Sequence, residues 1–487
     1  MRAVLVLILA AAVTAAEPAA LAAELDALID ADLAARKVQP LPQADAATLV
    51  RRAWIDLGGR IPTADEAVRG AGQDRQALLA SVIASPAWRQ ATFSWLADVL
   101  RVQSRLQDRT PGIAWIVWLR TGIRENMAWD AMARAMLASS GPALAPDGGP
   151  AGFTLRDAGM PLDHAAIAAQ TFLGTRIGCA QCHDHPFDRW TRMEFLRYAA
   201  FSADARTQLA PPKAAGLRGM LADAAPELRQ SARAVANIVG ARVEPARKDW
   251  IEIPKDWEGP GAKPGDHVSA QVLFGPAAPA AAGDPRQRLA AWMASADNPR
   301  FALAIGNRIW RRVFGYGLIE PVDDIRGDPA EALPPLQARL ARLVVECGYD
   351  LQRIHLVLCL TRHWGRAAWI GELPERGGIA PGRPASRLSA TAWWDSLVAL
   401  AIDEPDLDPV EDLGPLHQLR QRVADGGADA ILEAARRLSA LRKGGAKAAA
   451  ADDQQAVAAA ADQLLASVPA AEHQARIWLD AARYADT

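Results

Sequence analysis

Two cysteines and a histidine, in the stretch Cys179-Ala180-Gln181-Cys182-His183, have the types and spacing to do chemistry. This C-x-x-C-H pattern is typical of the attachment site of a c-type haem. Two thiols three positions apart can form thioethers with the two vinyl groups of one haem, and the adjacent histidine can then be the proximal iron ligand. Because the pattern occurs once in the chain, the sequence predicts at most one covalently attached haem.

The same residues also fit other kinds of site. In an exported protein, a C-x-x-C pair can be a plain disulfide or a redox switch. Cys179, Cys182, His183 and His185 could instead be ligands of a non-haem zinc or iron ion. That arrangement places four ligands within seven residues, and one metal is poorly placed to reach all of them. A purely structural role without a cofactor is the remaining alternative.

The residues beside the motif are candidates for orienting the haem. We expect Asp184 and His185 to lie outside the iron coordination and to orient His183 or the haem propionates. The sequence does not identify the sixth iron ligand. The methionines and histidines considered for it, each also an ordinary packing residue, are Met160, His164, Met193, His267, His355 and His363.

Outside the motif, few residue patterns indicate chemistry. Asp323 and Asp324 follow a proline and predict a turn or helix cap, with metal binding or acid/base chemistry as the alternative. Arg308, Arg311 and Arg312 predict a basic, solvated helix face. The chain has no Walker loop, dinucleotide-binding glycine motif, G-x-S-x-G elbow or H-E-x-x-H motif. The standard nucleotide-dependent and zinc-protease chemistries therefore lack their usual signature.

The N-terminus has the pattern of a cleaved secretory signal. Arg2 precedes an apolar run at residues 3–13, and small residues follow, with cleavage expected at Ala22 or at Ala16. The run is shorter than the roughly 20 apolar residues of a membrane-spanning helix, and no later stretch reaches that length. We therefore expect an exported protein, periplasmic or on the cell surface, with no transmembrane segment after signal cleavage.

Composition favours a mainly α-helical fold. The chain has 487 residues, a formal charge of −2 and 51% hydrophobic residues, many of them alanine, which favours helix. The near-zero charge argues against a strongly basic nucleic-acid-binding protein, so no nucleic-acid partner is expected. Four cysteines are too few for a disulfide scaffold, and Cys347 and Cys359 are expected to be buried. Thr63 and Glu66 predict a capping box at the start of a helix.

Changes in composition along the chain predict two helical domains with an insert between them. Proline and glycine are dense near residues 206–284, where short apolar runs at 250–253 and 268–274 suggest strands. The predicted units are a signal peptide (1–22), a helical domain with the C-x-x-C-H motif (23–205), an irregular or β-containing insert (206–284), a second helical domain (285–410) and an alanine-rich helical tail (411–487).

Several long motifs resemble those of a known family. FLGTRIGCAQCHDHPFDRWTRMEFLRYAAF (172–201), LVRRAWIDLGGRIPTADE (49–66) and KPGDHVSAQVLFG (263–275) resemble a cytochrome-associated family of exported proteins known chiefly from planctomycetes, domain of unknown function 1549. DNPRFALAIGNRIWRRVFGYGLIEPVDDIR (297–326) resembles its companion, domain of unknown function 1553. The motifs occur in the family's order and cover roughly residues 24–400.

The resemblance implies a large, exported, mainly helical protein whose activity is not established. Such proteins are often fused to a cytochrome c domain or to carbohydrate-binding modules, and are commonly encoded beside a secreted sulfatase-like protein. The family motif carries over to Cys179, Cys182, His183, His185, Asp188 and Trp190. Asp188 and Trp190 are thereby expected, with Asp184 and His185, to support the ligands rather than to bind iron.

The chain also departs from the family pattern. It has no separate cytochrome domain, and WLDAARYADT (478–487) resembles a motif usually found nearer the N-terminus. A duplicated segment, or a gene model that stops early, would explain that position.

The sequence therefore predicts an exported protein with one haem c and a redox or electron-transfer role tied to extracytoplasmic degradation. It would act with a redox partner and a secreted sulfatase-like protein. Whether it is an enzyme is open, a haem-dependent oxidoreductase being the candidate activity. The alternative is a non-haem scaffold or metal-binding protein that supports a secreted hydrolase.

Overall fold

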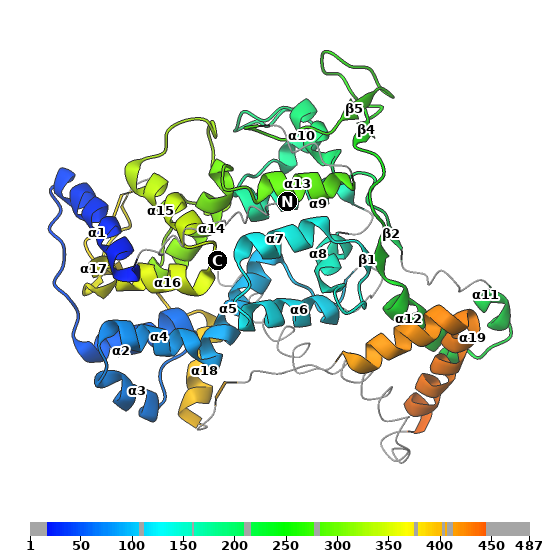
Figure 1. The fold of residues 1–487 in the computed structure, drawn as a ribbon, viewed down its shortest axis with the longest axis horizontal. Coiled ribbons are helices and arrows are strands. Elements are labelled where there is room, and N and C mark those ends of the chain that lie inside the picture. Colours follow the sequence, from blue (N-terminus) through cyan, green and yellow to red (C-terminus); the bar gives the residue numbers. More distant parts are fainter. Residues whose placement is uncertain are drawn as a thin grey trace, which may run out of the picture.

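The fold is built almost entirely of helices, which confirms the predicted mainly α class (Figure 1). The computed structural model describes residues 17–106, 112–157, 160–208, 216–276, 283–374, 378–401, 405–406 and 413–444. Residues 1–16 of the predicted signal and the tail beyond residue 444, which includes WLDAARYADT, lie outside this part. No helix among the described residues is long and apolar enough to cross a membrane.

The first helical region leads from the N-terminal helix to the C-x-x-C-H motif. Several of its helices begin at side chains that accept backbone N–H bonds, such as Asp45 and Asp74, and Thr63 and Glu66 form the predicted capping box. The elements are α1 (Pro18–Ala35), α2 (Ala46–Gly58), α3 (Ala64–Ala71), α4 (Arg75–Ala84), α5 (Pro86–Leu100), α6 (Ile113–Arg124), α7 (Trp129–Ala138), the 3₁₀ turn η2 (Gly149–Ala151), α8 (Gly152–Arg156), α9 (Pro161–Leu173), the 3₁₀ turn η3 (Gly178–Gln181) and α10 (Arg192–Ala199).

Among the described residues, the strands are short and form three small sheets. One is antiparallel in the order β1-β3-β2, one is the antiparallel pair β4-β5, and one is the parallel pair β6-β7. The strands are β1 (Gly141–Pro142), β2 (Thr207–Gln208), β3 (Arg242–Val243), β4 (Trp250–Glu252), β5 (His267–Ser269), β6 (Ala368–Trp369) and β7 (Arg383–Pro384).

The insert differs from its predicted form in two ways. The second predicted strand ends at Ser269, because the apolar residues after it leave the sheet and Phe274 packs on Trp190 and Trp292. The insert also contains a full helix, α12 (Pro226–Gly240), preceded by the short α11 (Leu217–Met220). The i, i+3, i+7 spacing of Ala232, Val235 and Val239 is the sequence signal for this helix.

The second helical region packs directly on the first. Its helices are α13 (Pro285–Met293), α14 (Pro299–Phe314), α15 (Pro335–Glu346), α16 (Leu351–Leu360), α17 (Arg362–Gly365) and α18 (Ala390–Ala401). Helix α14 is buried along nearly its whole length and contacts α9 as well as α15 and α16. A single cluster of buried residues therefore extends across both helical regions, from Leu21 to Ala380.

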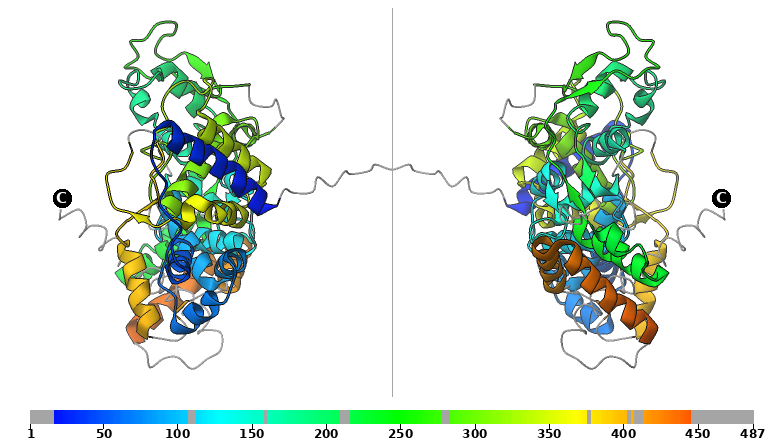
Figure 2. Two further views of the ribbon diagram at one scale, coloured as in Figure 1. Left: turned by 90° about the vertical axis from the view of Figure 1, so that its left-hand side faces the viewer. Right: turned by 90° about the vertical axis from the view of Figure 1, so that its right-hand side faces the viewer.

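A separate small lobe joins the insert to the tail. Helix α19 (Gly414–Gly444), which is interrupted at Gly427, packs against α12 although about 180 residues separate them in the chain. Val235 of α12 and Ile431 of α19 belong to a hydrophobic cluster distinct from the main core. Figure 1 shows these two helices side by side at one corner of the molecule, and Figure 2 shows the same pairing from another direction.

Candidate functional site

The C-x-x-C-H motif lies directly after α9, and the second helical region holds the end of that helix. Helix α9 ends at Gly174, whose φ of 60° is left-handed and whose carbonyl accepts a 2.6 Å bond from the Ile325 N–H. Arg308 of α14 donates to the carbonyls of Gln170 and Thr171, two of the last carbonyls of α9. Helix-end carbonyls have no partner within the helix, so these bonds fix the point from which the motif starts.

Both cysteines of the motif are accessible. Cys179 lies within the short turn η3, and the Cys182 N–H closes the turn on the Cys179 carbonyl at 3.4 Å. Both side chains are exposed, with free thiols. A planar group could therefore approach the two sulfur atoms without displacing core residues.

The hydrogen bond of the His183 ring indicates which of its nitrogens is free. Nδ1 lies 2.8 Å from the Asp184 carbonyl oxygen. A carbonyl can only accept, so Nδ1 carries the proton and, in the neutral ring, Nε2 keeps its lone pair. A backbone carbonyl on the other ring nitrogen is the usual partner of a metal-ligating histidine. The ring of His183 is thus in the tautomer that an iron ligand needs.

His185 has the opposite arrangement. Its Nδ1 accepts the Phe187 N–H at 3.2 Å, so the neutral ring carries its proton on Nε2. Its backbone N–H bonds the Trp190 carbonyl at 2.8 Å. His185 therefore helps to shape the loop, and in this tautomer it offers no lone pair to a metal.

The loop after His183 is braced by its own polar side chains. The carboxylate of Asp184 accepts the Arg192 N–H at 2.8 Å, and that of Asp188 accepts Trp190 Nε1–H at 3.1 Å. Trp190 is almost fully buried. A capping box between Thr191 and Glu194 then begins α10. The contact of Asp184 with the His183 ring is made by its carbonyl, while its carboxylate holds the start of α10.

The insert is tied to this loop through Arg192. The guanidinium donates to the Gln181 carbonyl inside the motif and pairs with Asp256 at 3.0 Å. The hydrogen bonds from Arg192 to the Asp256 carboxylate lower the pKa of that carboxyl. Arg192 therefore links the motif to the chain beside the β4-β5 hairpin.

The predicted turn at Asp323 and Asp324 is present, and it contacts the motif side of the molecule. Asp323 accepts Arg176 Nη2–H and Gln170 Nε2–H, both at 2.6 Å. Partial burial raises the pKa of the Asp323 carboxyl, but the bonds from Arg176 and Gln170 outweigh it and the pKa is lowered overall. Asp324 pairs with Arg326 at 2.7 Å. The turn thus joins the second helical region to the residues just before Cys179.

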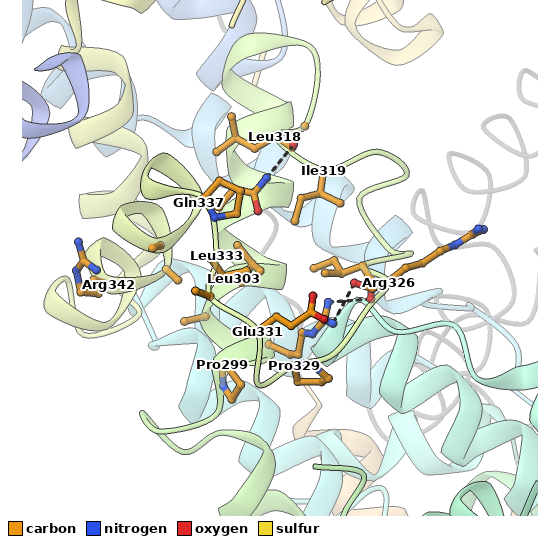
Figure 3. Close-up of a pocket in the computed structure, with 18 of the residues that line it drawn as sticks. Pro299, Leu303, Leu318, Ile319, Arg326, Pro329, Glu331, Leu333, Gln337 and Arg342 are labelled. Carbon is orange, nitrogen blue, oxygen red and sulfur yellow. Dashed lines mark hydrogen bonds between the residues drawn. The ribbon is translucent and has the colours of Figure 1, made fainter. Parts of the chain in front are cut away.

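Two pockets adjoin this turn. The smaller, about 390 Å³, is lined by Cys179 of the motif, by His185 of the following loop, and by Arg176, Asp324 and Arg326 among others. The larger, about 1190 Å³, lies over α14 and α15 and is mostly apolar. Figure 3 shows Leu303, Ile319 and Leu333 on its walls. Asp324 and Arg326 line both pockets, so the turn forms a shared wall between them.

The described residues do not form a ready metal-ligand set. Among them, no three His, Cys, Asp or Glu side chains come together in an arrangement that could hold a metal ion.

All four histidines considered for the sixth iron ligand are buried or in contact with other side chains. His164 is buried and its Nδ1 bonds Asp157 at 3.1 Å. His355 and His363 are fully buried in the core, and burial lowers the pKa of each to about 3. His267 stacks on Trp250 at 3.6 Å.

The predicted solvated arginine face on α14 is wrong for two of its three members. Arg308 is buried against the end of α9, and Arg312 is half-buried beside Trp95, bonding Thr92 Oγ1 at 3.2 Å. Burial lowers the pKa of each to about 10. Arg311 alone is exposed. Sequence spacing missed this because α14 is surrounded by other helices, so its polar side chains bond buried backbone groups.

Comparison with known families identifies the chain's class. The family described as protein of unknown function DUF1549 matches residues 24–207, and that described as protein of unknown function DUF1553 matches residues 285–409. The chain therefore belongs to the family in which a DUF1549 segment is followed by a DUF1553 segment, as its motifs predicted. Neither a curated protein nor a solved structure matches the chain.

Proposed function

We propose that this chain is an exported protein that carries one haem c through Cys179, Cys182 and His183 and has a redox or electron-transfer role. The observation that carries the proposal is the difference between the two histidines. His183 bonds a carbonyl through Nδ1 and leaves Nε2 for iron, whereas His185 accepts a bond at Nδ1. The exposure of both thiols is compatible with attachment from solution.

Attachment consumes no oxidant. Each S–H adds across one vinyl C=C bond of the haem: sulfur bonds one vinyl carbon, the hydrogen goes to the other, and a thioether results. The cysteines must therefore be reduced when haem arrives. The bound haem would supply one-electron exchange at its iron, while the protein supplies the thiols, the imidazole and the surrounding charges.

The accessible position of the motif suits exchange with other molecules. The loop is open to solvent, since Phe187 is 74% exposed and both cysteines are exposed. A redox partner could therefore reach the edge of the haem. We propose a periplasmic or cell-surface location, with a secreted sulfatase-like protein as functional partner. Oxidation by the haem in extracytoplasmic degradation is the proposed activity if the protein is an enzyme.

Covalent attachment can be tested directly. The full chain with its signal is expressed with cytochrome c maturation factors, and a denaturing gel is stained for haem peroxidase. We expect a stained band for the parent and none for Cys179→Ala/Cys182→Ala. Cys347→Ala removes a buried thiol outside the motif and serves as the matched control, which should keep the band.

Absence of covalent haem from the parent protein would favour the non-haem alternative. An unstained parent band, with an intact mass equal to the polypeptide or to the polypeptide with one disulfide, rejects the cytochrome proposal. Metal analysis of the same sample then separates a zinc or iron site from a scaffold without metal.

A further inference from the structure

The pocket of about 390 Å³ beside the motif is lined by a thiol, by aliphatic side chains and by an aromatic ring. Cys179 supplies a thiol at its edge, and Ala166 and Ile177 supply apolar wall. Phe187, on the same pocket, is an exposed residue. A flat, largely apolar molecule attached at Cys179 would lie against these groups.

Two arginines give this pocket a site for anions. Arg176 and Arg326 each bond one aspartate, yet their side chains are 47% and 57% exposed. A guanidinium has five N–H donors, and these bonds use only one of them in Arg176 and two in Arg326. The remaining donors lie on half-exposed guanidinium groups, so an incoming carboxylate can bond them while both aspartate pairs stay in place.

The charges around the turn leave a positive excess. Arg300 and Arg308 lie buried beneath it and donate to backbone carbonyls. The cationic side chains are Arg176, Arg189, Arg300, Arg308 and Arg326, against the anionic Asp188, Asp323, Asp324 and Asp328. One net positive charge next to an apolar pocket favours a ligand that carries carboxylates on an apolar frame.

We infer that Arg176 and Arg326 bind the propionates of the haem, so that the DUF1549 and DUF1553 segments hold the cofactor together. This inference rests on the proposed function. Arg176 precedes the motif in the first segment, and Arg326 comes from the second. Both are positioning residues: they orient the ring, while His183 binds the iron.

The test separates carboxylate recognition from covalent attachment. The full chain, made without haem and kept reduced, is titrated by visible absorbance with Fe(III) protoporphyrin IX and with its dimethyl ester, in which both propionates are masked. We expect the free acid to bind at least about tenfold more tightly than the ester, from the usual strength of charge-assisted hydrogen bonds. Arg176→Gln and Arg326→Gln should each weaken the acid about fivefold and leave the ester unchanged.

Two further variants guard against misfolding. Arg326→Lys keeps the charge and should retain most of the affinity for the acid. Arg311→Gln removes an exposed arginine paired with Glu320 outside this pocket, and should match the parent. Equal affinity for acid and ester, or parental affinity in both pocket variants, overturns the inference.

The gel assay tells the two failures apart. A haem-stained band together with no dependence on propionates or arginines leaves the c-type attachment standing and removes the inference. Propionate-dependent binding without a covalent band would instead keep the arginine–propionate contacts and reject the c-type attachment.

Discussion

At the residue scale, His183 of the motif and the neighbouring His185 have different tautomers because different backbone groups face their Nδ1 atoms. The carbonyl of Asp184 faces His183, and the N–H of Phe187 faces His185. Their spacing in the sequence alone could not distinguish these roles.

This difference predicts opposite effects of two neighbouring substitutions. In haem-loaded protein, His183→Ala should remove the proximal ligand, shift the Soret band and change the reduction potential. His185→Ala should leave the iron coordination unchanged, since its Nδ1 accepts a loop hydrogen bond. The measurement is the visible spectrum of the oxidised and reduced forms. A spectral change in His185→Ala equal to that in His183→Ala would contradict the assignment.

Two buried histidines predict how stability depends on pH. Burial lowers the pKa of His355 and His363 to about 3, against about 6.5 in an unfolded chain. Between these values the unfolded state binds more protons, so stability is full above about pH 6.5 and falls as the pH decreases. The limiting slope is about 1.4 kcal/mol per pH unit for each histidine. Urea unfolding at pH 7.5 and pH 5 measures it.

His363→Phe isolates one of the two contributions. Neither ring nitrogen of His363 has a hydrogen-bond partner among the described residues, and the ring already lies 5.2 Å from that of Phe314. The variant should lose the share of His363 in the pH dependence of stability, a limiting slope of about 1.4 kcal/mol per pH unit. A slope identical to the parent would show that His363 does not titrate on unfolding.

At the scale of elements, we expect the cap of helix α10 to set the local stability of the loop that follows His183. Thr191 and Glu194 begin α10 immediately after the loop, while Thr63 and Glu66 form the same capping box in α3. Thr191→Ala should cost about 1 kcal/mol and increase amide exchange across residues 183–192. Thr63→Ala is the matched control: a similar cost is expected, with unchanged exchange in the loop. Increased loop exchange in both variants would argue against a local effect.

Of the two predicted signal cleavage sites, the burial of helix α1 favours the one after Ala16. It begins at Pro18 and buries Leu21 and Ala22, together with Leu25, in the core. Cleavage after Ala22 would remove two of these buried side chains, whereas cleavage after Ala16 keeps the helix intact. We therefore predict that the mature protein begins at Glu17, which intact mass and N-terminal sequencing can check. A mature chain beginning at Ala23 would contradict this.

At the scale of the whole molecule, the two family segments share one core with the strands of the insert, while α12 of the insert and α19 form a separate lobe. Helix α14 of the second segment caps the end of α9 in the first, so the position of the motif depends on both. The lobe of α12 and α19 has its own hydrophobic cluster.

The separate cluster predicts local unfolding. Ile431 is fully buried within it, so Ile431→Ala should cost about 2–5 kcal/mol of local stability. Amide exchange should increase in α12 and α19 and remain unchanged in α14 and α15. Leu343→Ala in the main core is the control and should have the reverse pattern. Loss of protection in every helix of the Ile431 variant would show that the lobe and core unfold together.

The sequence by itself determined the helical class, the family and the motif, because each depends on local pattern. Thr63 and Glu66 predict the start of a helix, and the C-x-x-C-H motif occupies five consecutive residues. Only tertiary structure decided that Arg308 caps α9, that Asp323 pairs with Arg176, and that α12 packs on α19. These contacts join segments that are far apart in the chain. The periodicity of residues predicts local secondary structure, but it does not predict which distant segment a side chain will contact.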